Sequence, residues 1–284
     1  KKRPGFGLVL RETAGMGLQI NGPGGSLFAL RQLDRSTRGI AGTQERLSSL
    51  LRINRAADDA AGLAIVEGFR SEVRQLNAEV RGIQTGVNLI QTAEGSLGAQ
   101  SDAVSRIREL AVQAANGTLS DDQRQALNGE AQQLLQEIDA TAQNTEFNGL
   151  HPLDGSTGTI TLDAEGDLDI QFSESTVDSL GLNGLDISTQ AGASAALSTA
   201  DAALDRINQN RSALGAQESG LAAAADQRSL QSLNLQEAES RLRDLDVAEA
   251  FVEQTRNQVL LQGGISVLAQ ANLQNETAAT LLGG

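Results

Sequence analysis

Proline is almost absent from this chain of 284 residues and occurs only at positions 4, 23 and 152. Inside a helix, proline removes a backbone hydrogen bond and clashes with the preceding turn. The two long spans without proline, 24–151 and 153–284, can therefore form very long helices. This feature constrains the fold more than any other in the sequence.

Both spans carry apolar or small residues in alternating steps of three and four. That spacing, sustained over many turns, is typical of a coiled-coil seam. The first seam consists of Leu76, Val80, Ile83, Val87, Ile90, Ala93, Leu97, Gln100, Val104, Ile107 and Ala111. The second consists of Leu235, Ala238, Leu242, Leu245, Ala248, Val252, Thr255 and Val259.

Local signals predict where these helices are interrupted. Gly117 is expected to end the first long helix in a left-handed conformation, and Ser120 to cap the next helix, which ends near residues 147–149. The period changes to two over 157–172, which predicts a β-hairpin with its turn at 164–166. The helical pattern resumes at about residue 195 and continues nearly to the end of the chain.

The predicted fold class is mainly α: long antiparallel coiled-coil helices from both chain ends, with one small β-hairpin element. Residues 1–15 hold both lysines and precede the single methionine, Met16, which predicts a non-native or upstream extension. The expected division is 1–15 as this extension, 16–58 with 246–284 as a terminal-helix domain, 59–157 with 188–245 as a helical trunk, and 158–187 as the hairpin insertion.

The composition excludes several classes of function. A net charge of −14 argues against a nucleic-acid-binding protein, which needs a basic surface. With no cysteine and one histidine, His151, the chain offers no thiolate or multi-histidine metal site. No phosphate-binding loop or catalytic carboxylate pair is recognisable, and the acidic residues of 163–169 are better explained as a solvated strand face than as a calcium loop. We therefore expect no enzyme, no cofactor, no metal and no membrane span.

Several blocks of sequence resemble the bacterial flagellin family, in order and spacing. The N-terminal half contains ERLSSLLRINRAADDAAGLAI (45–65), QTAEGSL (91–97), RIRELAVQAANGT (106–118) and EFNGLHPLDGS (146–156). The C-terminal half contains RSALGAQ (211–217), SRLRDLDVAEA (240–250) and GGISVLAQAN (263–272). The chain departs from the family pattern at Leu50, where glycine is usual, at GPGG (22–25), and in lacking the large variable outer region. It is similar to a short flagellin.

The resemblance implies a structural subunit of the extracellular bacterial flagellar filament, polymerised into a helical propeller for motility. The implied partners are other copies of the chain, the flagellar export apparatus with an export chaperone, and the filament cap and hook-junction proteins. A flagellin-like protein of the hook–filament junction is the alternative. The residues expected to serve filament assembly are Leu27, Leu30, Leu33, Asn54, Arg55, Asp58, Asp59, Val267, Leu268, Leu281 and Leu282.

The same resemblance implies recognition by the host innate immune receptor, Toll-like receptor 5. Arg106, Leu110 and Glu130 match the family's receptor-binding positions and Gln113 matches an accessory contact, whereas Ser105 departs from the usual glutamine. Arg106 and Leu110 are four residues apart, so we expect them on one exposed helix face.

Among the residues expected to serve assembly, Asn54 is expected to cap the helix that carries Asp58 and Asp59.

Overall fold

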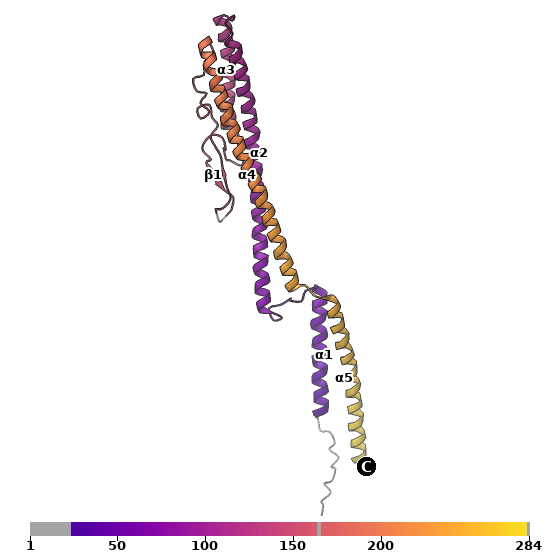
Figure 1. Ribbon diagram of the computed structural model, residues 1–284. Coiled ribbons are helices and arrows are strands. Elements are labelled where there is room, and N and C mark those ends of the chain that lie inside the picture. The colour runs from indigo at the N-terminus through magenta and orange to yellow at the C-terminus, as the bar shows by residue number, and fades with distance from the viewer. Residues whose placement is uncertain (1–23, 164–165, 283–284) are drawn as a thin grey trace, which may run out of the picture. The chain divides into compact units, whose positions relative to one another are not determined.

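The computed structural model describes residues 24–163 and 166–282, so the predicted extension at 1–15 lies outside the described residues. These residues form two compact units, one of 24–66 with 240–282 and one of 67–239 (Figure 1). The described chain contains five helices and one two-stranded antiparallel sheet, which confirms the predicted fold class. None of the described helices is long and apolar enough to cross a membrane.

The first unit pairs α1 (Gly24–Ser49) with α5 (Val247–Leu282) in antiparallel orientation. Small or polar side chains seven residues apart, Ala29, Ser36 and Thr43, are buried on α1. The residues of α5 that turn inward follow steps of four and three. They are Ala250, Gln254, Asn257, Leu261, Gly264, Leu268 and Ala271. This pairing is a coiled coil with small side chains at its seam.

The second predicted seam is only partly correct. Its first half, from Leu235 to Leu245, is half-buried, but Val252 and Val259 are 60% and 61% exposed. The chain is not helical at residues 244–246, where Asp246 Oδ1 accepts hydrogen bonds from the N–H groups of Ala248 and Glu249 and caps α5. Because α5 starts afresh after this break, a different face of the helix turns inward than a continuous helix would present.

The second unit contains most of α2 (Ala60–Ala114) and α4 (Gln190–Arg243), and all of α3 (Asp121–Asn144). The first predicted seam is confirmed, since all its residues from Leu76 to Ala111 are buried or half-buried. Alanines on α4 and α3 face this seam together with larger aliphatic side chains. This part of the core contains Ala131, Leu135, Ile138, Ala142, Ala196, Ala200, Ala203, Ile207 and Leu214.

Of the predicted helix boundaries, one cap is confirmed, one helix starts earlier than expected, and one cap is wrong. Ser120 caps α3 in a reciprocal arrangement with Gln123, as predicted. The start of α4 comes earlier than expected, because Thr189 Oγ1 accepts a hydrogen bond from the N–H of Gly192. Gly117 does not adopt the left-handed conformation; the end of α2 is instead satisfied by a side chain from α3.

The predicted hairpin is present, with β1 (Thr159–Thr161) and β2 (Asp169–Gln171) paired so that Ile160 lies opposite Ile170. Of its expected turn residues, 164 and 165 lie outside the described residues. Gln217 on α4 accepts a hydrogen bond from the Gln171 N–H at 2.7 Å and donates one to its carbonyl. One edge of the two-stranded sheet is therefore occupied by a side-chain amide.

The hairpin lies against α2 where that helix has no side chain. A Cβ placed on Gly86 would lie 2.6 Å from Leu162 Cδ1 and 2.9 Å from Ile170 Cδ1. A buried carboxylate holds the turn of the hairpin: Asp163 Oδ1 accepts hydrogen bonds from three backbone N–H groups, those of residues 166–168. Close packing of the hairpin on α2 depends on Gly86, because a Cβ there would collide with Leu162 and Ile170.

We predict that Gly86→Ala is less stable than Gly95→Ala, the control. Both substitutions remove a helical glycine from α2, which alone stabilises by about 1 kcal/mol. Only the methyl group at 86 collides with the hairpin, since nothing lies within 4 Å of a Cβ at Gly95. Overpacking should cost about 1–2 kcal/mol, measured as a difference in the free energy of unfolding by urea. Equal stabilities would contradict the close packing at Gly86.

Candidate assembly and recognition surfaces

Most of the exposed large apolar side chains in the described chain lie in the first unit. Those on α5 are Val247, Phe251, Val252, Val259, Leu260, Ile265, Val267 and Leu273. Six residues of this helix line a hollow of about 500 Å³. They are Phe251, Val252, Thr255, Arg256, Val259 and Leu260. We call the exposed apolar side chains of α5 the apolar stripe; exposed apolar side chains gathered over such a length of a protein surface mark an interaction site.

The apolar residues predicted for assembly divide into three groups. Leu27, Leu30 and Val267 are exposed. Leu33 and Leu268 are half-buried, and a Cβ on Gly264 would lie 3.2 Å from Leu33 Cγ, so Leu33 takes part in the α1–α5 seam. Leu281 and Leu282 belong to α5, but their side chains lie outside the described residues.

The polar residues predicted for assembly lie in the loop between α1 and α2. Asn54 does not cap a helix, which corrects the sequence-based expectation. Instead the Asp58 carboxylate accepts hydrogen bonds from the N–H groups of Asn54 and Arg55, at 3.1 and 2.8 Å. Asp59 is the residue that caps α2, through a 2.8 Å hydrogen bond from the Gly62 N–H. Sequence spacing misses this because Asn54 and Asp59 are equally good capping residues.

The hydrogen bonds received by Asp58 have an electrostatic consequence. The N–H groups of Arg55 and Asn54, in that order of importance, lower the pKa of the Asp58 carboxyl. Arg55 also forms a 2.7 Å ion pair with Glu45, which accepts a hydrogen bond from the Asn54 side chain as well. Backbone and side-chain bonds thus connect Glu45, Asn54, Arg55 and Asp58 into one network, which ties the loop to α1.

The crossing between α1 and α2 has an unusual backbone conformation at Leu50. Its φ is +58°, in the left-handed region that glycine adopts at little cost and leucine at a cost of about 1 kcal/mol or more. Its carbonyl accepts a hydrogen bond from the Leu245 N–H, and the Arg52 N–H donates to the Arg243 carbonyl at 2.6 Å. These two bonds hold the strained residue, whose side chain is 58% exposed.

A second surface, on the other unit, brings together two of the residues predicted to bind the receptor, Arg106 and Glu130. Arg106 on α2 donates two hydrogen bonds to Glu130 on α3, at 2.8 and 3.0 Å, and one to Glu109 at 3.0 Å. Hydrogen bonds to Glu130, and then to Glu109, raise the pKa of Arg106. Gln113 lies further along α2 and is exposed. The guanidinium is therefore held by two carboxylates at the surface.

Leu110 does not share this exposed surface, which corrects the expectation drawn from its spacing to Arg106. It is 1% exposed and belongs to the core of the second unit. The reason is that α2 packs against both α3 and α4, so more than one stripe of its surface is covered. Leu110 packs beneath the surface on which Arg106 and Glu130 lie.

Comparison with known proteins decides the family. A family model described as the bacterial flagellin N-terminal helical region matches residues 20–158, and one described as the bacterial flagellin C-terminal helical region matches 197–282. The chain belongs to the bacterial flagellin family. Among its relatives are the flagellar filament 30.7 kDa core protein of Treponema maltophilum, 38% identical, and the flagellin of Bacillus subtilis (strain 168), 35% identical. The matches cover 93% of this chain and 99% and 100% of the relatives, respectively.

Membership in the flagellin family makes this chain a structural protein of the extracellular flagellar filament and not an enzyme. The fold is also found in a putative flagellar hook-associated protein from Vibrio parahaemolyticus. That structure has a TM-score of 0.56 and is 14% identical, with 66% of this chain and 100% of that chain covered. At this identity the likeness concerns the fold alone.

We predict that Leu50→Gly stabilises this flagellin by about 1 kcal/mol, because it relieves the left-handed strain and removes a side chain with few contacts. The matched control is Arg35→Gly, at an exposed position inside α1. There glycine should destabilise by about 1 kcal/mol. Thermal unfolding of the purified chain measures both changes. A lower melting temperature for Leu50→Gly would show that leucine is favoured at this crossing.

Proposed function

We propose that the chain assembles by packing the apolar stripe of α5, with the exposed leucines of α1, against terminal helices of neighbouring copies. The observation that carries this proposal is that α5 exposes one apolar stripe while a different face is already paired with α1. Both helices therefore have a second face available for contact. A helix–helix contact through this second face links the α1–α5 pair of one copy to the α1–α5 pair of the next.

The shape of the contact suits an open helical polymer. The stripe residues Val252 and Val259 lie on α5, whereas Leu27 and Leu30 lie on α1, so one copy offers two different apolar surfaces. Contact between unlike surfaces of successive copies is head-to-tail and produces a filament when it does not close into a ring. The propeller of a motile bacterium is such a filament, and it would require export and assembly at the tip. The export apparatus, its chaperone, the cap and the hook-junction proteins are the partners that this role requires.

We further propose that Toll-like receptor 5 binds the surface around Arg106, Gln113 and Glu130. An exposed arginine fixed by two carboxylates is preorganised for a polar contact, and arginine is enriched among residues that dominate binding energy. Leu110 would contribute from below, by supporting the backbone that carries Arg106.

A protein of the hook–filament junction is the alternative function. The same terminal helices and the same fold would serve it, and the Vibrio parahaemolyticus structure has that fold. The relatives named above are filament proteins matched over nearly their whole length, which favours the filament. The number of copies per flagellum distinguishes the two roles, since a junction protein forms a short ring and a flagellin forms the shaft.

The assembly proposal predicts that Val252→Ser combined with Val259→Ser weakens polymerisation without weakening the fold. Both side chains are mostly exposed, so the free energy of unfolding of the monomer should change little. Loss of apolar contact between copies should raise the critical concentration for seeded polymerisation about tenfold. The control is Gln258→Ser with Gln262→Ser, two exposed polar residues of the same helix. Filaments that form at an unchanged concentration would contradict the role of the stripe.

The receptor proposal predicts that Arg106→Ala reduces binding of the monomer to the receptor ectodomain at least about tenfold, because it removes a preorganised guanidinium. Arg74→Ala, an exposed arginine elsewhere on α2, is the control and should bind as the parent does. Surface plasmon resonance measures both dissociation constants. Equal binding by Arg106→Ala and the parent would exclude this surface as the receptor site.

A further inference from the structure

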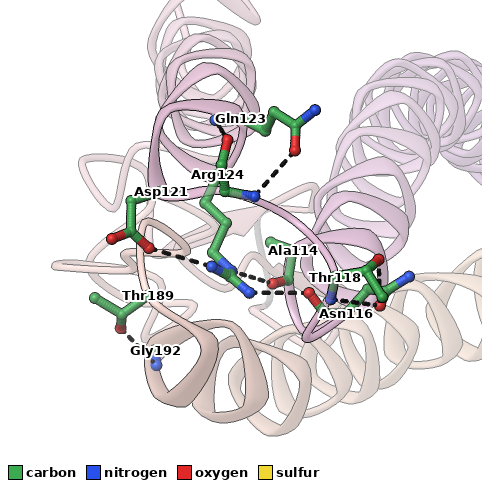
Figure 2. Close-up of polar contacts among 9 residues, drawn as sticks. Ala114, Asn116, Thr118, Asp121, Gln123, Arg124, Thr189 and Gly192 are labelled. Atoms are coloured by element: carbon green, nitrogen blue, oxygen red, sulfur yellow. Dashed lines mark hydrogen bonds and ion pairs between the residues drawn. The ribbon is translucent and has the colours of Figure 1, made fainter.

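Arg124, in the first turn of α3, is a buried arginine with an unusual set of partners. It is 6% exposed. Nε donates to the carbonyl of Ala114 at 2.8 Å, and Nη2 donates to the carbonyl of Asn116 at 2.9 Å. Figure 2 shows the guanidinium reaching back from α3 to these two carbonyls at the end of α2, with Asp121 on its other side at 3.2 Å.

These carbonyls explain why a charged group is stable there. The last turn of a helix leaves its carbonyl groups without partners and carries a partial negative charge. A guanidinium placed at this end supplies a donor to the Ala114 carbonyl and interacts favourably with the helix dipole. It also adds a second donor to the Asn116 carbonyl, which already accepts a hydrogen bond from the Leu119 N–H. The carboxylate of Asp121 is 97% exposed and contributes little, because water screens such a pair. Arg124 therefore ends α2 in the place of the glycine cap that the sequence predicted.

Arg124 is also the main inward contact of the first half of α3. Within α3, which the structure describes in full, the buried residues are Arg124, Ala131, Leu135, Ile138 and Ala142. Four of these five lie at or beyond residue 131. The turns that lead up to Glu130 are thus fixed by Arg124, with half-buried Leu127 and Asn128 beside it.

We propose that Arg124 is a positioning residue: its two hydrogen bonds to the end of α2 fix the register of the first turns of α3 and hold Glu130 opposite Arg106. Glu130 follows Arg124 by about 9 Å along α3, and Arg106 precedes Ala114 by about 12 Å along α2, at 1.5 Å per residue. A shift of α3 along α2 would break the bonds of Arg124 and separate Arg106 from Glu130 together. As far as it concerns the receptor, this inference rests on the proposed function.

The test measures the register directly. The chain has no cysteine, so Asp102→Cys on α2 and Gln125→Cys on α3 can be labelled selectively with nitroxides at two exposed positions. Electron–electron double resonance on the full chain then gives the distance distribution between the two helices. Arg124→Met should shift this distribution or broaden it at least about twofold. In unlabelled protein it should weaken receptor binding about tenfold, as substitutions outside a binding site can do.

Two further variants keep the test decisive. Arg124→Lys retains the charge but loses the paired donors, so it should give a smaller change in the distance distribution than Arg124→Met. Arg108→Met is the control: Arg108 pairs with Asp201 on α4 at 2.6 Å, and its loss should leave the α2–α3 distances unchanged.

An unchanged distribution in folded Arg124→Met would overturn the proposal. If circular dichroism shows that this variant does not fold, an unchanged distribution in Arg124→Lys would overturn it instead. A changed distribution with unchanged receptor binding would support the register role and overturn its link to the receptor. Failure of the proposed receptor function itself is seen separately, as full binding by Arg106→Ala.

Discussion

The first unit is held together by the pairing of α1 with α5 through small side chains. This pairing also decides which side chains of the two helices stay exposed. Ala29, Ser36 and Thr43 fill its seam, and Gly39 and Gly264 lie close to side chains of the facing helix. Such a seam brings two helices close together but buries little apolar area, so it stabilises weakly at about 25 cal/mol for each Å² of apolar surface. The larger apolar side chains are left on the outer faces, where neighbouring copies can cover them. The small side chains of the seam and the exposed apolar side chains of the outer faces thus belong to one arrangement of the two helices.

The second unit obeys a different constraint, because its helices close around their own core. There α2 is covered by both α3 and α4, and polar groups inside the core fix how these parts meet. The Gln100 side chain donates hydrogen bonds to the carbonyls of Ile138 and Ser175, and its own oxygen accepts one from the Ser175 hydroxyl. Since a buried amide without partners is costly, these three segments cannot slide past one another without a penalty. The unit therefore keeps a defined surface as well as a stable core.

The sequence predicted the parts of this fold that follow from repetition. The absence of proline and the three-and-four spacing predicted the long helices and the seam from Leu76 to Ala111, and the period of two predicted the hairpin. The failures all concern single contacts. The break at 244–246 changes which face of α5 turns inward, and Leu110 is buried because α2 is covered by both α3 and α4. Periodicity describes one helix with one covered face, so it cannot reveal how many neighbours a helix has.

For the candidate surfaces too, sequence comparison located the residues but not the contacts between them. Family resemblance located Arg106 and Glu130, but nothing in their spacing of 24 residues says that their side chains meet. That contact depends on where α2 ends and on how α3 returns. Sequence reasoning placed the helix end at Asn116-Gly117 and assigned it to glycine, whereas the structure satisfies it with a guanidinium that comes from the returning helix itself. One side chain then both ends the first helix and fixes the second. The pair at the surface is, in this sense, a consequence of a cap about two turns away.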